Sequence, residues 1–280
     1  MENAHVGVVG LGVIGLKLVE YLALEGHEVV AYNWRNVKVK EQQLSLNLDK
    51  KVKYEKVSME LLDRVKSRIR FVEDLQELSS CGLVIDSSRE DYDVKKDLYS
   101  SLLKKMSPKA ILASTTSSLS LQKLSDYFDK DRFVGIHFFN PPTKMKLVEV
   151  AFLDPNNREL YAEVYKFLKA LPDKKVVELP PIQGYIVNRL LFVYINAAIA
   201  FHEEFNLSPQ NIDEAMRFGT NVPMGPLELS DYIGNDVTLE ILKEFHSALN
   251  DVRYKPATAL VKLVEEGKLG KKTKSGFYKY

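Results

Sequence analysis

One histidine and one glutamate lie in two stretches that are otherwise apolar. The segment VGIHFFNPPTKMKLVEVA (residues 134–151) predicts two β-strands around a loop that two prolines stiffen, with His137 in the first strand and Glu149 in the second. An imidazole can transfer a proton near neutral pH, and a neighbouring carboxylate fixes its tautomer and stabilises the imidazolium. The residues leave two interpretations open: a structural buried pair, or an acid–base pair that acts on a substrate.

A glycine-rich loop supplies a second chemical signal. Gly10, Gly12 and Gly15 form the pattern G-x-G-x-x-G in VGVVGLGVIG, directly after a predicted strand and directly before a predicted helix. In this context the first glycine permits a tight turn, the second lets the backbone approach a pyrophosphate, and the third lets helix and strand pack closely. The pattern predicts a dinucleotide site; the alternative is a glycine-rich turn without a ligand.

The end of the next predicted strand bears on which dinucleotide binds. An NAD site typically has Asp or Glu there for the ribose hydroxyls, whereas AYNWRN places Asn33 at this point and Arg35 two residues later. Asn33 can hydrogen-bond a ribose without repelling a 2′-phosphate, and Arg35 could pair with such a phosphate. We expect NAD as the cofactor and leave NADP open for this reason; a solvated surface residue is the alternative for Arg35.

Strands and helices alternate through the first two thirds of the chain. This alternation predicts an α/β domain of the Rossmann type over residues 1–183, with a mostly parallel sheet covered by helices on both faces. Residues 37–65 are charged and helical in pattern. Beyond PPIQG only helical patterns follow, beginning with the long apolar segment YIVNRLLFVYINAAIAFHEEF, so we expect an all-α domain over residues 184–280.

Composition excludes several classes of protein. The chain has 39 Lys and Arg against 38 Asp and Glu, so no strong field draws nucleic acid or an anionic membrane. No apolar stretch is long enough to span a bilayer. The single cysteine, Cys81, excludes an internal disulfide framework and fits a reducing compartment, and the histidines lack metal-ligand spacing. We expect a cytoplasmic protein without a bound metal.

Several motifs, taken together, resemble one enzyme family. The stretches GIHFFNPPTKMKLVEV, ASTTSSL, GYIVNRLL and VPMGPLELSDYIGND resemble the L-3-hydroxyacyl-CoA dehydrogenases, including the 3-hydroxybutyryl-CoA dehydrogenases. The resemblance implies an NAD(P)-dependent enzyme that interconverts a 3-hydroxyacyl-CoA and a 3-oxoacyl-CoA. It implies that His137 is the general base in oxidation and that Glu149 orients it. It also implies an acyl-CoA substrate and a homodimer formed by the helical domain.

Four further residues match motif positions of the family. By this resemblance Ser117 hydrogen-bonds the substrate hydroxyl, Asn188 lies near the substrate carbonyl oxygens, and Glu90 and Lys95 line the cofactor near its nicotinamide end. Each has a structural alternative: a helix N-cap for Ser117, an amide bond within the helix for Asn188, and a solvated pair at a helix start for Glu90 and Lys95.

The chain also departs from the family pattern. Thr115 stands where the family usually has Asn, Ser87 and Ser88 replace an apolar dipeptide, and Asn33 replaces an acid. These positions surround the expected cofactor, so a catalytically weak paralogue is one alternative. For CoA we expect candidates in the Lys-rich region, namely Ser45, Lys50 and Lys51, with a solvated helical face as the alternative.

Two rival functions share the same scaffold. A gulonate dehydrogenase or its lens-crystallin relative usually has Pro after the catalytic His, where this chain has Phe138. A nucleotide-binding sensor would retain the fold without turnover. The intact pattern of His137 and Glu149 favours an enzyme.

Overall fold

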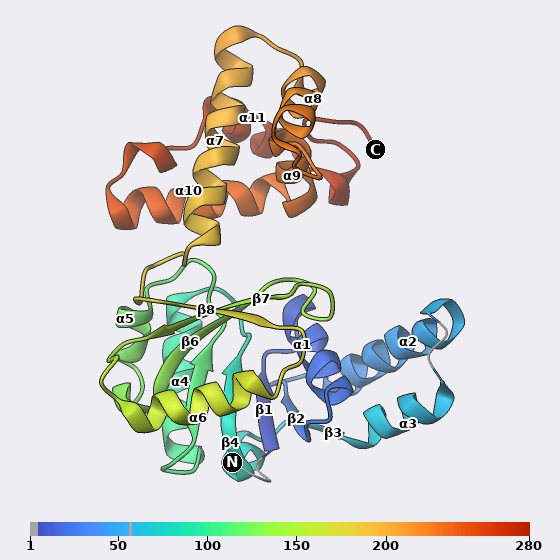
Figure 1. The fold of residues 1–280 in the computed structure, drawn as a ribbon, viewed down its shortest axis with the longest axis vertical. Coiled ribbons are helices and arrows are strands. Elements are labelled where there is room, and N and C mark those ends of the chain that lie inside the picture. Colours follow the sequence, from blue (N-terminus) through green and yellow to red (C-terminus); the bar gives the residue numbers. More distant parts are fainter. Residues whose placement is uncertain (1–4, 56–57) are drawn as a thin grey trace. The chain divides into compact units, whose positions relative to one another are not determined.

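The computed structural model describes residues 5–55 and 58–280, which form two compact units (Figure 1). The first unit ends at Tyr185 and the second comprises Ile186–Tyr280. The boundary that we predicted from sequence lies between residues 183 and 184.

An eight-stranded sheet forms the centre of the first unit, in the order β3-β2-β1-β4-β5-β6-β7-β8. All neighbouring strands are parallel except β6 and β7, which pair antiparallel. The chain leaves β1 toward one edge of the sheet and then returns to build outward from β4 toward the other edge. Ligands of such sheets bind at this switch point, outside the carboxyl ends of the strands. The strands are β1 (His5–Val9), β2 (Val29–Tyr32), β3 (Ile69–Val72), β4 (Cys81–Asp86), β5 (Ile111–Ser114), β6 (Phe133–Phe138), β7 (Leu147–Phe152) and β8 (Lys175–Leu179).

Helices cover both faces of this sheet. One apolar core joins the strands to α1 (Val13–Leu24), α2 (Val37–Glu55), α3 (Met59–Ser67) and α6 (Arg158–Lys169), and the core on the other face joins them to α4 (Tyr92–Lys105) and α5 (Leu121–Ser125). Buried strands such as VGIHF read as nearly continuous apolar runs because both of their faces are covered. This arrangement confirms the predicted Rossmann-type α/β domain.

Strand β3 is absent from the sequence prediction. It forms the outer edge beside β2, and only Val72 among its four residues is buried. Arg70 within the strand and the charged residues on either side weaken the apolar alternation that would predict a strand.

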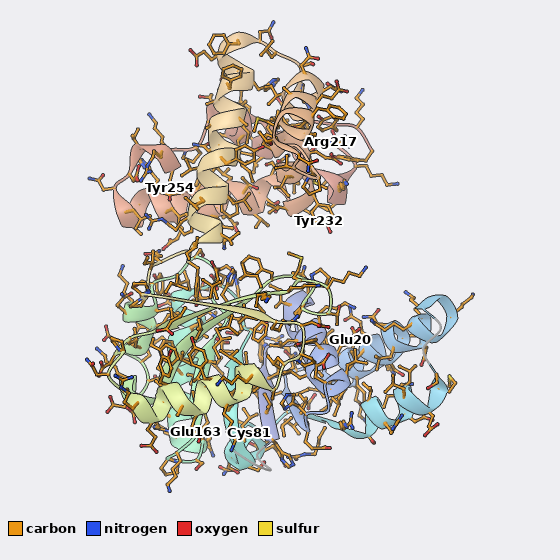
Figure 2. All side chains as sticks on the ribbon, viewed as in Figure 1. Glu20, Cys81, Glu163, Arg217, Tyr232 and Tyr254 are labelled. Atoms are coloured by element: carbon orange, nitrogen blue, oxygen red, sulfur yellow. The ribbon has the colours of Figure 1, made fainter. Side chains whose placement is uncertain are left out.

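The second unit is helical, as predicted. It contains α7 (Val187–Phe205), α8 (Pro209–Thr220), α9 (Pro226–Ile233), α10 (Asn235–Leu249) and α11 (Thr258–Glu265) around one apolar core. Helix α8 has a capped start: Ser208 accepts a hydrogen bond from the Asn211 N–H, and Pro209 occupies the first helical position. Tyr254, labelled in Figure 2, is a fully buried side chain of this core. No helix in the described ranges has the length and apolar character needed to cross a membrane.

Candidate active site

The antiparallel pairing of β6 with β7 brings His137 and Glu149 directly opposite each other. The His137 Nδ1 lies 2.9 Å from Glu149 Oε2, and the two residues are 4% and 0% exposed. A carboxylate only accepts hydrogen bonds, so the proton of this contact belongs to Nδ1 and Nε2 is left as the acceptor. The two side chains therefore form the hydrogen-bonded pair that proton transfer through Nε2 requires.

Ser117 occupies the other side of the imidazole. Its Oγ lies 3.1 Å from His137 Nε2, in the loop that follows β5. Glu90 holds this loop: its Oε1 accepts hydrogen bonds from the backbone N–H groups of Ser117 and Ser118, each at 2.7 Å, and from the Thr116 hydroxyl at 2.7 Å. Glu90 thus positions the hydroxyl that contacts the imidazole, and the two residues lie in one network.

Aromatic rings enclose the imidazole. Tyr185 stacks on His137 with ring centroids 4.8 Å apart and planes 20° apart, while Phe139 meets it edge-on at 4.6 Å. Gly135, on the same face of β6, leaves room for Tyr185, because a side-chain Cβ there would collide with the phenol oxygen. Burial, followed by the charges of Glu90 and Glu149, raises the pKa of Tyr185, so this phenol stays neutral.

The glycine loop lies at the switch point between β1 and β4. Gly10 has φ +86°, and a Cβ there would lie 2.6 Å from the Ser88 backbone; a Cβ on Gly15 would collide with the Gly10 carbonyl oxygen. At Gly12 nothing lies within 4 Å of the position that a Cβ would take. Gly12 also caps α1 without any side-chain hydrogen bond. Tight packing at the outer glycines and open space at the central one fit a dinucleotide whose pyrophosphate approaches the start of α1.

Asn33 and Arg35 follow β2 beside this loop. Asn33 Oδ1 accepts a hydrogen bond from the Leu11 N–H at 3.0 Å, and its Nδ2 donates to the Arg35 carbonyl oxygen at 2.7 Å. The Arg35 guanidinium lies 3.3 Å from the centroid of the exposed Trp34 ring. Asn33 therefore ties the glycine loop to the turn that carries Arg35.

Lys95 lies inside the first unit, where it is 1% exposed. Its Nζ donates to Asp86 Oδ2 at 2.6 Å, and the Tyr99 hydroxyl donates to the same oxygen at 2.7 Å. Burial by itself would raise the pKa of Asp86, but the Lys95 charge and the hydrogen bonds from Lys95, Ser88 and Tyr99 outweigh it, and the pKa is lowered. Lys95 thus stabilises the carboxylate at the end of β4, and its contact with a cofactor remains a prediction.

Two of the departures from the family pattern have structural roles at the same edge. The Thr115 hydroxyl donates to the Asp86 carbonyl oxygen at 2.9 Å, and the Ser88 N–H donates to Asp86 Oδ1 at 2.8 Å. Both residues therefore support the loop after β4. The hydrogen bond between His137 and Glu149 is present alongside these departures.

The remaining predicted residues belong to helices α7 and α2. Asn188 belongs to the second unit, in the first turn of α7. Among the CoA candidates, Lys50 is exposed and Ser45 is half-buried on α2. Lys51 lies 3.2 Å from Glu20, a fully buried carboxylate of α1 that is labelled in Figure 2, so this lysine holds α2 to α1. Within residues 5–55 and 58–280, no group of three or more His, Cys, Asp or Glu side chains could hold a metal ion.

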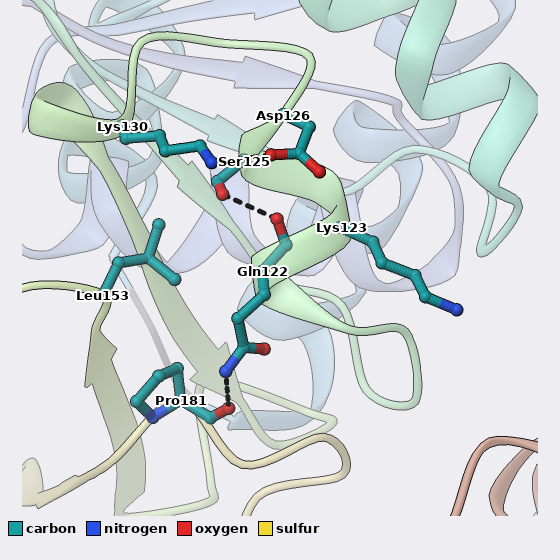
Figure 3. A pocket seen from close by; sticks show the side chains of 7 residues that line it. All are labelled: Gln122, Lys123, Ser125, Asp126, Lys130, Leu153 and Pro181. Atoms are coloured by element: carbon teal, nitrogen blue, oxygen red, sulfur yellow. Dashed lines mark hydrogen bonds and ion pairs between the residues drawn. The ribbon is translucent and has the colours of Figure 1, made fainter.

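The segment that leads to the second unit is fastened to the first. A hollow of about 460 Å³ lies beside α5, and at its edge Gln122 Nε2 donates to the Pro181 carbonyl oxygen at 2.8 Å. Figure 3 shows the side chains that line it. Gln183 Nε2 donates to the Ser118 carbonyl oxygen at 2.7 Å, one residue from Ser117. Neither His137 nor Glu149 lines the hollow. The two glutamine hydrogen bonds anchor the segment before Tyr185.

Sequence reasoning missed Tyr185 and the Asp86 network. Asp86 ends an apolar strand at the switch point, a signal that could have singled it out. Tyr185 carried no such signal, because its role depends on a stacking contact between residues far apart in the chain.

Comparisons with known proteins identify the family of both units. Residues 5–181 match the model of the 3-hydroxyacyl-CoA dehydrogenase NAD binding domain, and residues 184–280 match that of the 3-hydroxyacyl-CoA dehydrogenase C-terminal domain. A 3-hydroxybutyryl-CoA dehydrogenase of Bradyrhizobium diazoefficiens is 38% identical over 98% of this chain and 94% of its own length. The mitochondrial hydroxyacyl-coenzyme A dehydrogenase of Homo sapiens is 36% identical over 99% and 91%.

A solved structure shares the whole fold. The (S)-3-hydroxybutyryl-CoA dehydrogenase from Ralstonia eutropha is 33% identical, with a TM-score of 0.92 over 99% of both chains. Two family models that together span nearly the whole chain, and relatives that match its full length, confirm the resemblance. The chain belongs to the 3-hydroxyacyl-CoA dehydrogenase family.

Proposed function

We propose that this protein interconverts a 3-hydroxyacyl-CoA and a 3-oxoacyl-CoA, a reaction of fatty acid metabolism, with His137 as the acid–base residue. The observation that carries the proposal is the contact of His137 with Glu149 through Nδ1 and with Ser117 through Nε2. His137 lies near the carboxyl end of β6, at the same edge of the sheet where the glycine loop follows β1.

In the direction of oxidation, the substrate hydroxyl loses a proton as its carbon loses a hydride. His137 Nε2 takes that proton, and Glu149 stabilises the imidazolium through Nδ1. Ser117 Oγ, 3.1 Å from Nε2, holds the hydroxyl oxygen beside that nitrogen. In reduction the imidazolium returns the proton. NAD bound at the glycine loop would supply the hydride acceptor, and the Gly12 backbone and the start of α1 would hold its phosphates.

We propose that Asn188 donates a hydrogen bond to a substrate carbonyl oxygen, which polarises it during reduction. Exposed lysines of α2, including Lys50, attract the CoA phosphates, whereas Lys51 is paired with Glu20.

A direct assay tests the activity. Purified protein is mixed with acetoacetyl-CoA and NADH, and absorbance of the reduced cofactor is followed. Turnover is expected, and His137→Gln should lower kcat by about 10²- to 10⁴-fold, while His5→Gln, a change at β1, leaves it unaltered. Binding of NADH without turnover of acetoacetyl-CoA would contradict the proposal and favour a non-catalytic sensor.

We also propose a homodimer formed by the helical unit. Several large apolar side chains of this unit are exposed, among them Leu190 at 68%, Phe218 at 82% and Tyr232 at 62%. Packing against a second copy of the chain would remove these apolar side chains from water. Sedimentation equilibrium should give twice the chain mass of 31.9 kDa; a monomer at micromolar concentration would refute the dimer.

A cytoplasmic location fits the lone thiol. Cys81 is buried, and burial raises its pKa to about 11, so it stays a protonated thiol that does not form disulfides.

A further inference from the structure

In this fold the turn after β2 contacts the adenosine ribose of a dinucleotide. In this chain residues 33–36 of that turn include no Asp or Glu. In an NAD-specific site a carboxylate at this point binds the ribose hydroxyls and repels a 2′-phosphate. In this chain Asn33 stands where that carboxylate would be, one residue beyond β2. Its backbone N–H donates to the Val72 carbonyl oxygen. Its amide is neutral, and both of its polar groups bond to backbone. The repulsion that excludes NADP is therefore missing at this position.

Arg35 supplies positive charge at the same turn. Its guanidinium lies flat enough on Trp34 to approach the ring centroid to 3.3 Å, and both side chains are exposed. Stacking uses the face of the guanidinium and leaves its N–H groups directed outward in the plane, which is the geometry of bidentate phosphate binding. Among the side chains that the structure describes, no carboxylate forms an ion pair with Arg35.

The neighbouring acids accept backbone hydrogen bonds, and Asp74 Oδ1 accepts one from the Gln76 N–H at 2.9 Å. Glu73 follows β3, next to β2, and its Oε1 accepts a hydrogen bond from the Val37 N–H at 3.3 Å. It therefore caps the start of α2. The exposed Lys38 in the first turn of that helix adds a second positive charge to the region.

We propose that this turn accepts the 2′-phosphate of NADP(H), with Arg35 as the residue that binds it and Asn33 as the residue that admits it. The protein then uses both NAD(H) and NADP(H). The inference rests on the proposed function, since it concerns the same cofactor site, but it concerns the adenosine end and not the reacting end.

Binding of cofactor fragments tests the inference without turnover. Adenosine 2′,5′-bisphosphate and adenosine 5′-monophosphate differ only in the 2′-phosphate, and calorimetry gives the dissociation constant of each. The bisphosphate should bind the unaltered protein about tenfold more tightly, and the advantage should shrink as salt is raised. Trp34 is the only tryptophan of the chain, so quenching of its fluorescence gives a second reading from the proposed site itself.

Variants assign the effect to the two residues. Arg35→Gln should remove the preference for the bisphosphate, and Asn33→Asp should reverse it by adding a like charge beside the phosphate. Arg158→Gln removes the same charge from an exposed position on α6 and should leave the preference unchanged.

Two results would overturn the inference: equal affinity for both fragments, or an unchanged preference in Arg35→Gln. If either occurred while NADH still supported turnover of acetoacetyl-CoA, the proposed function would stand and only the 2′-phosphate site would fall. If that turnover failed while the bisphosphate was still preferred, the 2′-phosphate site would stand and the proposed function would fall.

Discussion

The phenol ring of Tyr185 lies against the imidazole of His137, with centroids 4.8 Å apart and an angle of 20° between the planes. Tyr185 is the last residue of the first unit and adopts φ +54°, a left-handed backbone conformation that few residues other than glycine take up. The contact joins the His137–Glu149 pair to the end of the segment that Gln122 and Gln183 hold by hydrogen bonds.

Replacement of Tyr185 separates the ring from its hydroxyl. Tyr185→Phe keeps the stack and removes a buried oxygen that has no hydrogen-bond partner among the described residues, so we expect unchanged kcat and a free energy of unfolding equal or up to about 1 kcal/mol higher. Tyr185→Leu loses the stack and should lower kcat roughly tenfold or more by loosening the imidazole. Steady-state kinetics and urea unfolding measure both. Equal kcat in the Leu and Phe variants would show that the stack does not orient His137.

Replacement of Glu149 tests the tautomer of His137. An amide in Glu149→Gln can donate as well as accept, so it no longer fixes the proton on Nδ1 or stabilises the imidazolium, and kcat should fall by about 10²- to 10⁴-fold. Glu149→Asp keeps the charge at a longer distance and should retain more activity than the Gln variant. The comparison of kcat at saturating substrate decides the matter, and a Gln variant as active as the unaltered protein would contradict the role.

Glu90 positions Ser117 through charge-assisted hydrogen bonds. Glu90→Ala leaves the backbone N–H groups of Ser117 and Ser118 without their acceptor, and we expect kcat to fall roughly tenfold to a hundredfold. Glu90→Gln still offers one accepting oxygen and should recover part of the loss. Loss of thermal stability without a change in kcat would assign Glu90 a purely structural role.

The buried pair of Asp86 and Lys95 predicts an asymmetric effect on stability. Lys95→Met leaves a buried carboxylate without its partner and should cost about 3–5 kcal/mol of unfolding free energy, whereas the double variant Asp86→Asn, Lys95→Met should cost less. Denaturant unfolding at pH 7 measures each value. Equal costs for the single and double variants would mean that the unpaired charge is not the cause.

The lowered pKa of Asp86 also predicts how stability changes with pH. Its stabilising contribution is present above the unfolded aspartate pKa of about 4 and is lost as pH falls through the lower folded pKa, because the unfolded state then binds the proton first. The free energy of unfolding should therefore fall more steeply below about pH 4 in the unaltered protein than in Asp86→Asn. Parallel curves would exclude this contribution.

Much of the candidate site could be predicted from the sequence because its residues belong to short local motifs. The glycine loop is recognised from its spacing between a strand and a helix, and His137 and Glu149 stand out because polar residues are rare in buried strands. Their register could be expected from the stiff loop between them, and the structure places them directly opposite each other.

What the sequence could not provide depends on contacts between distant segments. Lys51 meets Glu20 between two helices, and Tyr185, in the segment after β8, stacks on His137 of β6, so neither pair has a local signature. The edge strand β3 escaped for a different reason, since a half-exposed strand carries little apolar signal.

The fastening of the segment before Tyr185 makes the protein modular. His137, Glu149, the loop that carries Ser117 and the aromatic ring stacked on the imidazole all precede Ile186, within the first unit. An exchange of everything after Tyr185 for a different helical unit would therefore leave these contacts of the imidazole in place.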